Sequence, residues 1–126
     1  KENKKIEEQK IFFKIDEIFA RPGNMTIRYM ISDEIHIGKP IDITNPHITK
    51  MIDTYLNHLE FICNMYQEKI ISEYMIDAFV GIRISDVFKC ATIMSYIDSE
   101  RASEKEPKLW ETVETVGKEL KSKSQK

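Results

Sequence analysis

Apolar residues recur every three or four positions along most of this chain, which is the spacing of an α-helix. The longest of these stripes predict four main helices. They span residues 1–20, 46–69 and 83–102, with a last helix that opens at Pro107. The stretch 46–69 is apolar around most of its circumference, so we expect it to be a central helix with neighbours on several sides.

Cap and breaker residues mark the helix boundaries and add two shorter helices. Pro22 and Gly23 end the first helix, and Asn24 is the predicted N-cap of a second helix of about ten residues. Asn45 is the predicted N-cap of the central helix, which then has a proline at its first position. Ser72 caps a further short helix. The pattern therefore predicts helices joined by brief turns.

These elements define an all-α fold class, a helical bundle of four main helices plus one or two short helices. With only 4 Gly and 4 Pro, the chain is poor in the turn residues that sandwiches and barrels need. Its length suits one domain, so we assign residues 1–126 to a single helical domain. Within it, residues 1–10 form a polar helical extension and residues 121–126 a solvated tail.

The charge and the cysteine content narrow the classes of function. A formal net charge of -2, with both signs mixed along the chain, argues against nucleic acid as a partner, because attraction to phosphates needs a basic surface. Cys63 and Cys90 both fall in apolar helical stretches, and we expect them to be buried free thiols. Free thiols favour a reducing, cytoplasmic location.

Residues capable of metal binding or catalysis are present, but their spacing does not match that of metal ligands or catalytic pairs. His36, His47 and His58 are eleven residues apart, and no pair has the close helical spacing of zinc ligands. Arg28 and His36 only loosely imitate the Arg–His pair of helical ribonucleases. Cys63 and His58 point in different directions around one helix, which argues against a Cys–His nucleophile. We therefore expect no metal, no cofactor and no catalytic residue.

Three polar residues in otherwise apolar helices form the candidate site. Asn57 and Glu60 lie in the segment YLNHLEFICNMY of the central helix, and Arg101 ends the segment SYIDSER. Buried polar groups are costly unless they are satisfied, so these side chains need partners. We interpret Glu60 and Arg101 as a charged pair at a helix junction, which is either structural or part of a binding site.

The segments YLNHLEFICNMY, IISEYMIDAF, SYIDSER and PKLWETVETV together resemble the bacterial and phage domain-of-unknown-function family numbered 4760. The resemblance covers about residues 24–120, and it departs from the family where Cys90 and Ile93 replace a frequent aromatic. It implies a helical domain without an established activity, which in many members follows a transmembrane helix. Matched by position, the family's polar pattern falls on Asn57, Glu60 and Arg101, followed by the aromatic Trp110.

The leading functional hypothesis is a non-enzymatic domain that acts through a protein partner or by forming a homo-oligomer. No stretch reaches the roughly 18 apolar residues that a membrane span requires. The chain begins with Lys1 rather than Met, and residues 1–10 resemble a juxtamembrane helix, so we expect a membrane tether only in an upstream segment. Two alternatives stay open: a nuclease-like enzyme of phage conflict, and a small-molecule sensor with a pocket among Tyr55, Tyr66 and Met94.

Overall fold

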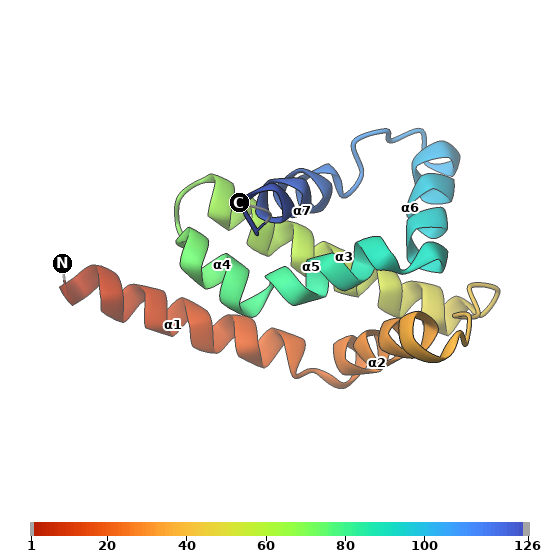
Figure 1. Ribbon diagram of the computed structural model, residues 1–126, viewed down its shortest axis with the longest axis horizontal. Helices are drawn as coiled ribbons and strands as arrows, with labels where there is room; N and C mark the ends of the chain where they lie inside the picture. The colour runs from red at the N-terminus through yellow and green to blue at the C-terminus, as the bar shows by residue number, and fades with distance from the viewer. Residues whose placement is uncertain (1, 125–126) are drawn as a thin grey trace.

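The computed structural model describes residues 2–124 of the chain. The prediction of an all-α fold is confirmed over this range, because every regular element in it is a helix. The predicted count of four main helices plus one or two short ones is not confirmed, since residues 2–124 form seven helices. They are α1 (Glu2–Phe19), α2 (Pro22–Ile37), α3 (Pro46–Gln67), α4 (Glu73–Phe79), α5 (Gly81–Lys89), α6 (Ala91–Ser103) and α7 (Glu111–Ser124), as shown in Figure 1.

The central helix of the fold is α3, as its sequence predicts. It packs against α2, α4 and α7, and Figure 1 shows it crossing the middle of the molecule between α2 and α7. Burial of apolar side chains on several faces of one helix supplies the main favourable term for folding. The buried side chains of α3 are Ile52, Tyr55, Leu56, Leu59, Ile62 and Cys63.

The prediction of one long helix over residues 83–102 is wrong, because the segment is divided into α5 and α6. Cys90 separates the two helices with φ -93° and ψ 101°, which is extended backbone. In α6, Ile93 and Ile97 are buried, whereas Ala91 is exposed. In Figure 1, α6 turns sharply away from α5.

Two helices begin at residues other than those predicted. Pro107 lies in the turn between α6 and α7, and α7 begins only at Glu111. Trp110, just before that start, has φ 56°, in the left-handed region that L residues rarely adopt. At the other end of the chain, α2 begins at Pro22, so Asn24 lies inside its first turn and is not the N-cap.

Both ends of the described chain are helical. Figure 1 shows the N-terminal half of α1 extending beyond the rest of the fold. α7 continues to Ser124, so residues 121–124 of the predicted solvated tail are exposed but helical, while residues 125–126 lie outside the described range. Among residues 2–124, no helix combines the length and the apolar composition needed to cross a membrane.

Candidate functional site

Glu60, one of the three predicted site residues, caps a helix that is distant in the sequence. Its Oε1 accepts the backbone N–H of Val113 at 2.8 Å, and its Oε2 accepts that of Thr112 at 3.3 Å. The first N–H groups of a helix have no partner within the helix, and the N-terminal end carries partial positive charge. A carboxylate from α3 therefore satisfies and stabilises the first turn of α7.

Asn57 lies one turn before Glu60 on α3 and holds the residue that precedes α7. Its Oδ1 accepts the indole N–H of Trp110 at 2.8 Å. The Trp110 ring is 5% exposed and stacks on Tyr96, with 6.3 Å between the ring centroids. Burial of the indole and its hydrogen bond offset the cost of the left-handed backbone at this position.

The predicted pairing of Glu60 with Arg101 is wrong. Arg101 instead forms an ion pair with Glu114 at 3.0 Å, and its Nε donates to the carbonyl of Leu109 at 2.8 Å. Partial burial raises the pKa of Glu114, but the hydrogen bonds from Arg101 and Lys118 outweigh it and lower the pKa overall. Arg101 thus fixes the turn between α6 and α7 through its contacts with Leu109 and Glu114.

The structure therefore brings all three predicted residues to one place, the turn that leads into α7. Each of them binds a group of this same chain: Asn57 an indole, Glu60 two backbone amides, and Arg101 a carbonyl and a carboxylate. We call Asn57, Glu60 and Arg101 the α7 clamp. The hydrogen bonds and the ion pair of the α7 clamp join α3 and α6 to the turn and to the first part of α7.

A second carboxylate cap, which the sequence did not reveal, involves Glu34 of α2. Its Oε2 accepts the backbone N–H of Thr92 at 3.0 Å and the thiol of Cys90 at 3.2 Å, while its Oε1 accepts the N–H of Ile41 at 3.0 Å. Partial burial raises the pKa of Glu34, but the hydrogen bonds, led by those of Thr92, lower it to about 2. Nothing local in the segment SDEIHIG signals this role, because its partners are distant in sequence.

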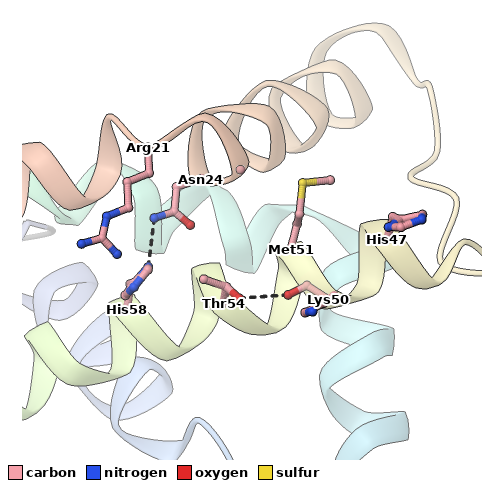
Figure 2. A pocket seen from close by; sticks show the side chains of 8 residues that line it. Arg21, Asn24, His47, Lys50, Met51, Thr54 and His58 are labelled. Carbon is pink, nitrogen blue, oxygen red and sulfur yellow. Dashed lines mark hydrogen bonds between the residues drawn. The ribbon is translucent and has the colours of Figure 1, made fainter.

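A pocket of about 360 Å³ lies between the first turn of α2 and the outer face of α3, as Figure 2 shows. Four of its side chains are basic, and none of its lining residues is acidic. Its apolar wall comes mainly from Met51. We call it the basic pocket, and it is lined by Arg21, Gly23, Asn24, His47, Lys50, Met51, Thr54 and His58.

Asn24 and His58 form a fixed pair at one end of the basic pocket. Asn24 is 3% exposed, and its Nδ2 lies 2.8 Å from the carbonyl of Ile18 and 2.9 Å from His58 Nδ1. A carbonyl only accepts, so this atom of Asn24 is the amide nitrogen, and Nδ1 of His58 accepts its second hydrogen. Burial, with the nearby charge of Arg21, lowers the pKa of His58. The neutral ring therefore carries its proton on Nε2.

Arg83 of α5 is the main cation that sequence reasoning missed. It lies over the ring of Phe19, 4.5 Å from its centroid, and donates to the carbonyl of Phe79. Its Nε is buried and has no hydrogen-bond partner within residues 2–124. Burial, helped by the charge of Arg28, lowers the pKa of Arg83. The cation–π contact joins α5 to the end of α1, and the hydrogen bond to Phe79 joins it to the end of α4.

The remaining residues singled out in the sequence do not assemble into a reactive group. Burial raises the pKa of Cys63 to about 12, with a further contribution from Glu60. Tyr55 is 1% exposed in the core, and Tyr66 donates to Glu119 at 3.2 Å. In the described part of the chain, no group of three or more His, Cys, Asp or Glu side chains could hold a metal ion.

The fold and the clamp together define an all-helical domain whose helices are joined by side-chain caps. Residues 3–120 match the family model of DUF4760, a domain of unknown function, and the chain belongs to that family. The expected family membership is thereby confirmed and extends over nearly the whole chain. No curated protein and no solved structure matches the chain.

Proposed function

We propose that this protein is a non-enzymatic helical domain that works by self-association through α1. The observation that carries the proposal is an apolar stripe on the outer face of that helix. The side chain of Phe13 is 67% exposed and that of Ile6 is 49% exposed. Large apolar side chains that stay in water on one helix face are typical of interaction surfaces.

The stripe continues an apolar contact that already joins α1 to the rest of the fold. Phe12 packs on Phe79 of α4, with 3.9 Å between the ring centroids, and the Phe13 ring lies 5.5 Å from that of Phe12. Ile6 and Phe13 are seven residues apart, so they lie on one side of the helix. A partner helix on this side would extend the same aromatic cluster.

A second copy of this chain is the occupant to which we commit. The sequence of α1 contains four lysines and five acidic residues in alternating clusters, so two copies do not meet as like-charged surfaces. A twofold arrangement uses the same stripe on both copies, and an antiparallel pair places Ile6 of one copy near Phe13 of the other.

The non-enzymatic part of the proposal is supported by the α7 clamp. Its three polar side chains are the strongest candidates for chemistry in the sequence, and each is taken up by a partner in its own chain. A cytoplasmic location is likewise a proposal, supported by the free buried thiols of Cys63 and Cys90. A membrane tether upstream of this domain stays a prediction from the family resemblance, and cell fractionation of the full-length protein would test it.

Light scattering after size-exclusion chromatography tests the self-association directly. We expect the wild-type chain to be a dimer and Phe13→Ser to be a monomer with an unchanged helical circular-dichroism spectrum. The matched control is Ile37→Ser, which removes a side chain that is 71% exposed at the far end of α2. The control should stay dimeric. A monomeric wild-type protein, or a Phe13→Ser variant that remains a dimer, would overturn the proposal.

A further inference from the structure

The basic pocket has the composition of an anion-binding site. Arg21, Lys50, His47 and His58 line it without any acidic neighbour in the lining. At Arg101, by contrast, a cation at a helix junction is paired with the carboxylate of Glu114. We infer that this pocket binds a small molecule with an oxyanion head group, a phosphate or a carboxylate, independently of self-association.

The two strong cations of the pocket have no counter-charge. Neither Arg21 nor Lys50 forms an ion pair within residues 2–124. Both side chains are exposed and so are accessible to a ligand. The chain as a whole has a net charge of -2, so a hollow whose lining contains basic but no acidic side chains is a local positive field in an otherwise slightly acidic protein.

The hydrogen bond from Asn24 fixes the His58 ring as a neutral hydrogen-bond donor. The buried amide of Asn24 occupies Nδ1 of the ring at 2.9 Å, which leaves the proton on Nε2. The amide is itself fixed by its bond to the carbonyl of Ile18 at 2.8 Å. Figure 2 shows Arg21, Asn24 and His58 gathered at one end of the pocket. A donor that is positioned before the ligand arrives loses little entropy on binding.

The start of α2 adds backbone donors to the same pocket. Its N-cap residue, Arg21, makes no side-chain cap hydrogen bond. The N–H groups of Gly23 and Asn24, both in the lining, have no acceptor in the part of the chain that the structure describes. Free N–H groups at a helix start suit the oxygens of an anion, and here they complement the four basic side chains and do not act alone.

The size of the pocket indicates more than a bare ion. A volume of about 360 Å³ falls at the lower end of the range of small-molecule sites, roughly 300–1,000 Å³. Met51 supplies a flexible apolar wall beside Gly23. The chemistry therefore suits a small molecule with an oxyanion at the Arg21–His58 end and an apolar body against Met51.

Titration of the ¹⁵N-labelled protein with inorganic phosphate, phenyl phosphate and benzoate tests the inference. We expect saturable shifts of the Gly23 and Asn24 amides and of His58 Nε2, with phenyl phosphate or benzoate binding more tightly than phosphate. Comparing phenyl phosphate with benzoate distinguishes the two head groups. Arg21→Gln should weaken binding about tenfold, the usual loss for a charge-assisted hydrogen bond. Lys50→Gln, farther from the Arg21–His58 end, should weaken binding less.

Arg28→Gln is the matched control, because it removes an exposed positive charge from the same helix outside the basic pocket. It should leave the affinity unchanged. Three outcomes would overturn the inference: no saturable shift with any probe, shifts spread over lysines on all faces, or equal weakening by Arg28→Gln. An unchanged amide spectrum of each free variant shows that a loss of binding is not a loss of fold.

Discussion

The carboxylate of Glu60 on α3 accepts the backbone N–H of Val113 in the first turn of α7 at 2.8 Å, across 53 residues of sequence. A second relationship of this kind joins Glu34 on α2 to the N–H of Thr92 in α6 at 3.0 Å. Both helices thus begin where a glutamate from another helix meets them. These two caps make the positions of α6 and α7 depend on tertiary contacts more than on their own sequences.

Replacing Glu60 by Gln should destabilise the protein by about 1–2 kcal/mol, as for the loss of a helix N-cap. The amide has a single acceptor oxygen and no charge, so it cannot serve both N–H groups at the start of α7. Denaturant unfolding at a fixed protein concentration measures the change. Glu68→Gln, an exposed glutamate at the end of the same helix, is the control and should leave the free energy of unfolding nearly unchanged. Equal effects of the two substitutions would refute the cap.

The helix starts that sequence predicted well are those with local signals. Asn45 accepts the N–H of His47 at 2.9 Å at the start of α3, and Ser72 accepts the N–H of Met75 at 3.2 Å at the start of α4. In both, the cap and the capped group are two or three residues apart. Such contacts are determined by a short stretch of chain, so the sequence reveals them directly.

The starts that sequence missed depend on residues far away in the chain. The break at Cys90 is stabilised by Glu34, and the late start of α7 is stabilised by Glu60 and by the hydrogen bond from Trp110 to Asn57. Helical periodicity continues through the break, so no local pattern marks it. Asn57, Glu60 and Arg101 could be singled out as polar residues that need partners, but the partners themselves follow only from the fold.

Glu34 should make the stability of the protein depend on acid pH. Its pKa is about 2 in the folded protein, below the ordinary value of 4.5. A lowered pKa contributes stability that is fully present above pH 4.5 and is lost as the pH falls from 4.5 toward 2. After allowance for solvent screening, the contribution is about 1–2 kcal/mol.

Unfolding free energies measured at several acid pH values test this contribution. Glu34→Gln should be less stable than the wild type at neutral pH. The difference between their free energies of unfolding should shrink as the pH falls from 4.5 toward 2. Asp33→Asn removes an exposed carboxylate from the neighbouring position. Its free energy of unfolding should change with pH in the same way as that of the wild type. A constant difference between Glu34→Gln and the wild type at all pH values would show that the charge of Glu34 has no such role.

The two thiols should be unreactive in the folded protein. Burial raises the pKa of both Cys63 and Cys90 to about 12, so at neutral pH almost no thiolate is present to react. We expect no labelling by a disulfide reagent such as Ellman's reagent under native conditions, and two labelled thiols per chain in denaturant. Fast labelling of either cysteine in the native protein would contradict their burial.

Adding one methyl group at two glycines should have opposite effects on stability. At Gly117 in α7, a Cβ would clash with the ring of Phe88 and would come within 2.8 Å of Ile84. Gly117→Ala should therefore destabilise the protein by about 1–3 kcal/mol, the usual cost of overpacking. Gly23→Ala is the control, because its Cβ would meet only Met51 at 3.7 Å, which is an ordinary contact.

The comparison of these two variants separates packing from helix propensity. Alanine favours a helix over glycine by up to about 1 kcal/mol, so propensity alone predicts that both substitutions stabilise the protein. We expect a small gain for Gly23→Ala and a clear loss for Gly117→Ala in thermal or denaturant unfolding. Stabilisation by both would mean that α5 and α7 do not approach as closely as the structure shows. A loss confined to Gly117→Ala would establish that this glycine is required where α7 rests on Phe88 and Ile84.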